Sequence, residues 1–119
     1  MNDNIKNPLR GEIWLVNWNP SRGSEQSGIR PSLIIQNDFG NKNLNFPNTI
    51  VLTISTKGRE IPFHVKLIPN QLNGLSDISY IKAEQVLTIS KERLIKKLGE
   101  ISDNEYKLVN NGLNLVLDL

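Results

Sequence analysis

The sequence predicts a small, mainly β domain that ends in one α-helix. Several short segments are rich in β-branched and aromatic residues, and turn-forming residues separate them. The final segment instead carries apolar residues at helical spacing, directly after a helix-capping pattern. A chain of 119 residues suits one domain with its own core. We expect five or six strands in a small barrel of SH3-like size, followed by the helix.

Composition narrows the possible functions. The chain has no cysteine, which excludes disulfides and thiolate zinc sites and favours a reducing cytoplasm. His64 is its single histidine, so no mechanism can use two imidazoles and we expect no metal or other cofactor. No segment is apolar for the ~18 residues that a membrane helix needs. The net charge of +2 fits a polyanionic partner without requiring one.

The domain is expected to span 10–119, after a flexible N-terminal arm at 1–9. Its first strand is predicted over 11–18, where the chain reads GEIWLVNW and both faces carry apolar groups. Sheets buried on both faces are closed or well covered, which favours a barrel. The strand ends before Asn19-Pro20, and a polar loop continues to Ile29.

Four further segments are predicted as strands. Pro31 can stand only at the start of a strand or on an edge, so the second strand is expected over about 32–36. Residues 37–48 are a turn-rich connection. The remaining strands are predicted at 49–55, where apolar residues alternate, at 62–67, and at 78–89, the last as two short strands or one strand kinked near Lys82-Ala83.

Two segments have helical signals. Residues 90–98, SKERLIKKL, are predicted as a short helix or turn. In the last segment Ser102 precedes Glu105 by three residues, which forms a capping box. One apolar stripe then runs along this helix, and its glycine implies close packing, since glycine is disfavoured in a helix by about 1 kcal/mol. The stripe consists of Leu108, Val109, Gly112, Leu113 and Val116.

Arg30 stands where the polar loop enters a buried strand, in the stretch GSEQSGIRPSLIIQND. An arginine presents a planar fork of donors that matches two phosphate oxygens. Fixing its stem at a strand start would hold that fork ready for a developing charge, and Gly28 would allow a phosphate to approach the backbone closely. The alternative is a structural arginine that pairs with Glu25 across the loop.

Residues 10–38 resemble the opening of the MazF/PemK (Kid) family of toxin endoribonucleases. The shared pattern begins with Arg10-Gly11-Glu12 and Pro20. It continues with Gly23-Ser24-Glu25-Gln26, then Gly28 and Arg30-Pro31, and it ends with an apolar strand. Weaker matches continue to about residue 93. The resemblance implies a plasmid-maintenance toxin fold, a homodimer, and metal-independent cleavage of single-stranded RNA to 2′,3′-cyclic phosphate and 5′-hydroxyl ends. It also implies inhibition by a cognate MazE-like antitoxin.

The resemblance assigns catalytic roles to three positions. Arg30 matches the main catalytic arginine. Ser55 matches a threonine near the end of the third strand, and Thr53 and Thr56 are neighbouring alternatives for this role. The structural alternative for Ser55 is a strand-end hydroxyl that caps a turn. Glu25 is a supporting position that orients the arginine or takes part in proton transfer. Leu87 departs from relatives that often carry a basic residue there.

Eight further residues are expected to contact RNA. We expect three of them, Arg22, Lys57 and Arg59, to line a basic groove beside Arg30. His64 is expected to be structural, and Trp14 and Trp18 to serve as core or dimer contacts, with base stacking left open for Trp18. The eight RNA-contact candidates are Arg22, Ser24, Gln26, Thr53, Thr56, Lys57, Arg59 and Gln85.

Two other functions remain open from the sequence. One is a non-catalytic SH3-like module that binds nucleic acid without cleaving it, kept open by Ser55 and Leu87. The other is a toxin that inhibits DNA gyrase, because a gyrase inhibitor shares the fold of the family. The intact Gly-Ser-Glu-Gln and Arg-Pro residues argue against both.

Overall fold

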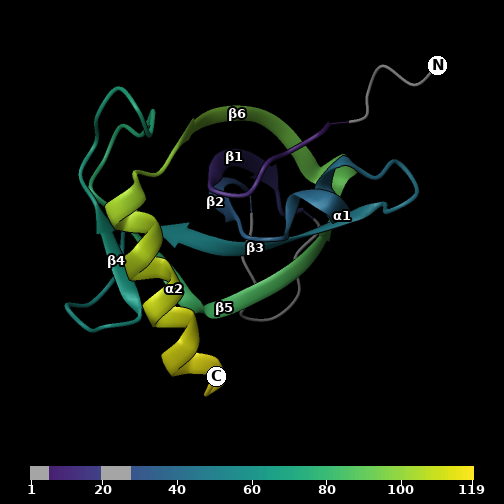
Figure 1. Cartoon of the computed structure of the whole chain (residues 1–119). Coiled ribbons are helices and arrows are strands. Elements are labelled where there is room, and N and C mark those ends of the chain that lie inside the picture. Colours follow the sequence, from purple (N-terminus) through teal and green to yellow (C-terminus); the bar gives the residue numbers. More distant parts are fainter. Residues whose placement is uncertain (1–5, 20–27) are drawn as a thin grey trace.

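The computed structural model describes residues 6–19 and 28–119 (Figure 1). It contains six strands, two α-helices and one short 3-10 helix within these residues. The order along the chain is β1 (Glu12–Asn17), β2 (Ile29–Ile34), α1 (Asp38–Lys42), β3 (Asn48–Ser55), β4 (His64–Leu67), β5 (Ser79–Ser90), η1 (Lys91–Arg93), β6 (Leu94–Glu100) and α2 (Asp103–Leu117). The predicted mainly β class with a C-terminal helix is confirmed.

All strands join one antiparallel sheet in the order β4-β5-β3-β2-β1-β6. The sheet curls, so that β6 and β5 lie on opposite sides of the central strands in Figure 1. Its hydrogen bonding is not closed, because β4 and β6 are edge strands among the described residues. The connection from β4 to β5 lies against β6 instead, where the Glu100 N–H donates to the Leu72 carbonyl at 2.9 Å.

β1 forms as predicted, whereas β2 begins at Ile29, before the predicted start near residue 32, and ends at Ile34. β1 alternates its side chains between two cores, with Ile13 in one and Trp14 in the other. Pro31 belongs to β2 opposite Leu15 of β1, but pairing of β2 with β3 begins only at Ser32 with Thr53. A proline therefore stands before the ladder to β3 begins, at the strand start where its missing N–H is tolerated.

β5 is one long strand with an irregularity, which confirms one of the two predicted forms. Thr53 of β3 pairs with Lys82, whereas the neighbouring Leu52 pairs with Val86. Residues 83–85 are therefore extra, and they bend β5 close to the predicted kink. The Ala83 N–H donates to the Phe63 carbonyl at 3.0 Å, which ties the bend to the segment before β4.

Two segments differ from the sequence prediction. The turn-rich connection contains the short helix α1, capped by Asn37, whose side chain accepts from the Gly40 N–H. Residues 90–98 begin as the predicted turn, η1, but continue as β6. Leu94 and Leu98 have the i,i+4 spacing of a helix, yet pairing with β1 holds them in a strand.

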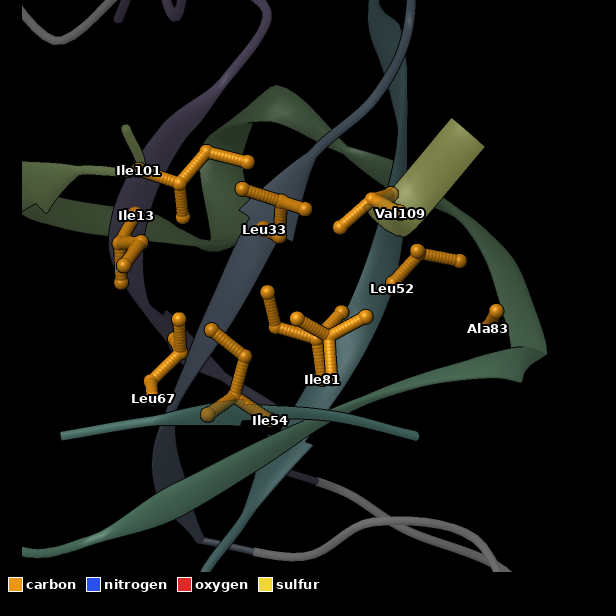
Figure 2. Packing of buried hydrophobic residues seen from close by; sticks show 10 residues of the cluster. Ile13, Leu33, Leu52, Ile54, Leu67, Ile81, Ala83, Ile101 and Val109 are labelled. Atoms are coloured by element: carbon orange, nitrogen blue, oxygen red, sulfur yellow. The ribbon is translucent and has the colours of Figure 1, made fainter. Parts of the chain in front are cut away.

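The core lies between the curled sheet and α2. Figure 2 shows its side chains converging from several strands and from Val109 of α2. The capping box of Ser102 and Glu105 is present. A Cβ at Gly112 would lie 3.2 Å from the Ala83 Cβ, which confirms close packing there. Leu108 is the exception to the predicted stripe, since it is 52% exposed.

A second core lies on the other face of the sheet. It contains Trp14 and Trp18, each 8% exposed, together with apolar residues of β2, β3, β5 and β6. The burial of both tryptophans supports their predicted role as core residues and leaves Trp18 little surface for base stacking.

Candidate active site

Two neighbouring cross-strand rows bring polar side chains onto one face of the sheet, opposite the core that contains α2. Directly opposed residues of antiparallel strands share a face. In the first row His64 pairs with Lys82, Lys82 with Thr53, and Thr53 with Ser32. In the second row Lys66 pairs with Tyr80, and Tyr80 with Ser55. We call this surface the polar face.

Arg30 belongs to the second row. It pairs with Val16 of β1, and continuing the β2–β3 register by two residues beyond the pair of Ser32 and Thr53 brings Arg30 opposite Ser55. The Trp18 N–H donates to the Gly28 carbonyl at 2.8 Å, which fixes the backbone just before Arg30. Gly28 has a φ of 75°, a conformation that favours glycine. The arginine is exposed, so its fork lies on a rigid stem at the surface.

Ser55 ends β3, and its Oγ accepts a hydrogen bond from the Lys57 N–H at 3.1 Å. The turn-capping role that the sequence left open is therefore present. A hydroxyl that accepts one hydrogen bond can still donate its proton, so Ser55 keeps a donor for a phosphate oxygen. Thr56 follows in an exposed position outside the strand.

Thr53 has a different environment from Ser55. It is 1% exposed, and its hydroxyl donates to Oε1 of Gln85 in a short hydrogen bond. Gln85 belongs to the extra residues of the β5 bend, so this bond joins the bend to the middle of the polar face. Thr53 and Gln85, both predicted to contact RNA, are thus brought together, with Thr53 buried beneath the surface.

His64 connects three elements. Its Nε2 lies 2.7 Å from Oε2 of Glu84, and its Nδ1 accepts from the Arg59 N–H at 3.0 Å. Because Nδ1 accepts a hydrogen bond, the contacts favour the tautomer that carries hydrogen on Nε2. Both ring nitrogens are engaged and the side chain is 6% exposed, which supports the predicted structural role.

The loop between β3 and β4 carries two of the predicted basic residues. Lys57 and Arg59 are exposed there. A Cβ at Gly58 would lie 2.1 Å from Cγ of Tyr80, so the loop rests directly on that ring. The Tyr80 hydroxyl also donates to Glu60 at 3.2 Å. Arg22, Ser24, Glu25 and Gln26 lie outside the described residues.

Lys82 and Tyr80 are among the residues of the polar face to which the sequence analysis assigned no role. Both are half-buried and alternate with Ile81 and Ala83 of the core. The available signal was the alternation of polar and apolar residues along this strand, but it shows only that the side chains of Lys82 and Tyr80 point away from the core. Their position beside Thr53 and Ser55 depends on strand pairing, which the sequence does not reveal.

Other kinds of site find little support among the described residues. No group of three or more histidine, aspartate or glutamate side chains is arranged to hold a metal ion within residues 6–19 and 28–119. In the same part of the chain, no helix is long and apolar enough to cross a membrane.

Comparison with known protein families identifies the chain as a member of a class of small toxins. Residues 9–117 match the model of a family described as PemK-like, MazF-like toxin of type II toxin-antitoxin system. The chain belongs to this family, because the match spans nearly all of it.

Curated relatives and solved structures agree with the family. The chain is 42% identical over 112 residues to an endoribonuclease MazF of Staphylococcus saprophyticus, covering 92% of this chain and 91% of that protein. It is 39% identical to an endoribonuclease MazF of Staphylococcus epidermidis, with the same coverage. A mycobacterial endoribonuclease solved in complex with its cognate antitoxin is 26% identical, with a TM-score of 0.77 over 94% of this chain and 96% of that one. MazF from Deinococcus radiodurans, 22% identical over 96% and 99% of the two chains, has the same fold with a TM-score of 0.79.

Proposed function

We propose that this chain is the toxin of a type II toxin-antitoxin system and cleaves single-stranded RNA, mRNA included, without a metal ion. Family membership and the two curated endoribonuclease relatives support the activity. The location of the site is supported by the β2–β3 register, which, when continued beyond the pair of Ser32 and Thr53, brings Arg30 opposite Ser55 on the polar face. It would act in the cytoplasm, where mRNA is available.

The chemistry uses the RNA's own 2′-hydroxyl as nucleophile. The 2′-oxygen attacks the adjacent phosphorus, the bond to the 5′-oxygen breaks, and a 2′,3′-cyclic phosphate and a 5′-hydroxyl form. The 2′-hydroxyl loses a proton and the leaving 5′-oxygen gains one. Arg30 would hold the phosphate oxygens as negative charge accumulates on the pentacoordinate phosphorus.

Ser55 and Glu25 would assist Arg30. The Ser55 hydroxyl can donate to a second phosphate oxygen from the neighbouring strand. Glu25 would orient Arg30 or transfer a proton. Lys57, Arg59, Thr56 and Gln85, with Arg22, Ser24 and Gln26 of the preceding loop, would contact the nucleotides on either side, while Thr53 supports Gln85 from below.

Cleavage of a long single-stranded RNA in the presence of EDTA tests this function. Primer extension should detect discrete cuts, the products should carry 5′-hydroxyl ends, and Arg30→Ala should lose cleavage with little change in thermal unfolding. Wild-type cleavage by Arg30→Ala would remove the arginine from the mechanism. RNA left intact by the wild-type protein would instead favour a non-catalytic nucleic-acid-binding module or a gyrase inhibitor.

The natural inhibitor would be a MazE-like antitoxin, and the toxin would be a homodimer. The mycobacterial relative in complex with its antitoxin supports the first of these. We propose that a disordered segment of the antitoxin folds over the polar face and covers Arg30. Equal binding of the antitoxin to free toxin and to toxin saturated with uncleavable RNA would contradict this arrangement.

A further inference from the structure

Lys82 is a cation on the polar face with no role assigned so far. It lies in β5 between Ile81 and Ala83, both of which are fully buried in the core, so its side chain leaves the sheet on the opposite side. It pairs directly with Thr53 on one side and with His64 on the other. Lys82 is half-buried, so its position is held by the strands around it.

The charge of Lys82 is not neutralised within the described part of the chain. Its ammonium makes no ion pair or hydrogen bond there. The nearest acidic residue along the strand, Glu84, is engaged by His64 at 2.7 Å. Lys66 on the same face has a carboxylate partner, Glu60, at 3.9 Å. A half-buried cation without a counter-charge is a site that an anion can occupy.

The strand register relates Lys82 to Arg30. The two lie two strands apart and in adjacent rows of the same face. Strands are spaced by about 4.8 Å and alternate residues by about 6.7 Å, which gives a separation of about 12 Å between their Cα atoms. Both side chains are long, so their charged ends can contact different phosphates of one RNA strand.

We infer that Lys82 binds a phosphate of the RNA that neighbours the scissile phosphate. This inference rests on the proposed function for its ligand, and it adds a contact that positions the strand across Thr53 and Ser55. Lysine serves here as a point charge, whereas the arginine provides the planar fork at the reacting phosphate.

Binding of an uncleavable RNA tests the inference separately from cleavage. The probe is a single-stranded RNA of mixed sequence that carries 2′-O-methyl groups throughout, so the nucleophile is blocked. We expect Lys82→Gln to bind this probe about three- to tenfold more weakly at low salt. The slope of log affinity against log salt should fall by about 0.7, as expected for one lost phosphate contact on a single strand.

Matched variants separate a phosphate contact from a structural effect. Lys107→Gln removes the same charge from an exposed position on α2 and should keep wild-type affinity and salt slope. Lys82→Arg should restore most of the lost affinity and the slope, because it restores the charge. Thermal unfolding of Lys82→Gln should match the wild-type protein, because within residues 6–19 and 28–119 the lysine has no ion pair or hydrogen bond to lose.

The outcomes distinguish this inference from the proposed function. Lys82→Gln with wild-type affinity and slope would overturn the inference even if the protein cleaves RNA. Weaker binding with an unchanged salt slope, or no rescue by Lys82→Arg, would overturn it as well. A wild-type protein that binds the probe but leaves natural RNA intact would contradict cleavage and leave the Lys82 contact standing.

Discussion

His64 and Glu84 are joined across β4 and β5 by a 2.7 Å contact between Nε2 and Oε2, while Nδ1 of the same ring accepts from the Arg59 N–H. The ring therefore links the β5 bend to the loop that follows β3. This loop carries Lys57 and Arg59, and the bend carries Gln85, so three predicted RNA contacts depend on one buried imidazole.

Glu84 variants test whether this link is a hydrogen bond to a neutral ring. Glu84→Ala should lower the free energy of unfolding by about 1–2 kcal/mol, because it leaves the buried Nε2–H without an acceptor. Glu84→Gln keeps an acceptor oxygen and should cost less than half as much. Urea unfolding at neutral pH measures both, and nitrogen NMR of the ring should find hydrogen on Nε2. Equal losses in the two variants would mean that the charge of Glu84 matters instead.

The hydroxyl groups of Ser55 and Thr53 on β3 should have different functions. Ser55→Ala should slow single-turnover cleavage by about a hundredfold, as for other lost donors to a developing oxyanion. Ser55→Thr should retain most activity, because it keeps the hydroxyl. Thr53→Val should reduce stability through the lost bond to Gln85, with a smaller effect on the rate. A larger rate loss in Thr53→Val than in Ser55→Ala would transfer the phosphate contact to Thr53.

Gly58 and Tyr80 should behave as a coupled pair. A methyl group at Gly58 would collide with the Tyr80 ring, which pairs with Ser55 in the register of β3 and β5. Gly58→Ala should therefore displace the ring or the loop, and we expect about tenfold slower cleavage with about 1 kcal/mol of destabilisation. In a Tyr80→Ala background the same change should add little, and a double-mutant cycle measures the coupling. Strictly additive losses would show that the ring contact is unimportant.

The sequence predicted the strand that carries Ser55, because its apolar residues alternate cleanly. It placed Arg30 just before the second strand, because Pro31 limits where a strand can begin, whereas the structure includes Arg30 in β2. The sequence did not predict β6, because Leu94 and Leu98 also fit a helix and only pairing with β1 decides between the two. The position of Lys82 on the polar face was missed for a similar reason. Its neighbours Thr53 and His64 are far away in sequence, and long-range pairing leaves no local signal.

Lys91 should be among the most important charged residues for stability. It is 6% exposed, and its Nζ donates to the carbonyls of Gly40, Asn41 and Asn43 at 2.9–3.2 Å. Lys91→Met would leave these acceptors unpaired and should lower the free energy of unfolding by about 3 kcal/mol. Burial lowers the pKa of Lys91, which shows that desolvation of the ammonium offsets part of the stability that its three hydrogen bonds contribute.

Urea unfolding of Lys91→Met measures this contribution, and Lys42→Met is the matched control. Lys42 is exposed in the last turn of α1, and its loss should change stability by less than about 0.5 kcal/mol. Hydrogen exchange should also become faster throughout 38–46 in Lys91→Met, because the lysine holds the end of α1. Similar stabilities of the two variants would mean that water replaces the ammonium at the three carbonyls.

Lys97 should make stability depend on pH only in strongly alkaline solution. Its Nζ lies 3.0 Å from Oε2 of Glu12, and this hydrogen bond raises the pKa of Lys97 above its ordinary value of 10.5. A raised folded-state pKa means that the stabilisation is complete below 10.5 and is lost as the pH rises through the higher value. The side chain is 43% exposed, so solvent screening limits the contribution to less than about 1 kcal/mol. Lys97→Met should therefore unfold more easily than the wild-type protein by an amount that is constant between pH 7 and the ordinary pKa of 10.5 and that shrinks at higher pH. Lys96→Met, at the neighbouring exposed position of β6, should show no such trend. A difference between Lys97→Met and wild type that stays constant at higher pH would mean that packing of the lysine stem, not its charge, stabilises the edge of the sheet.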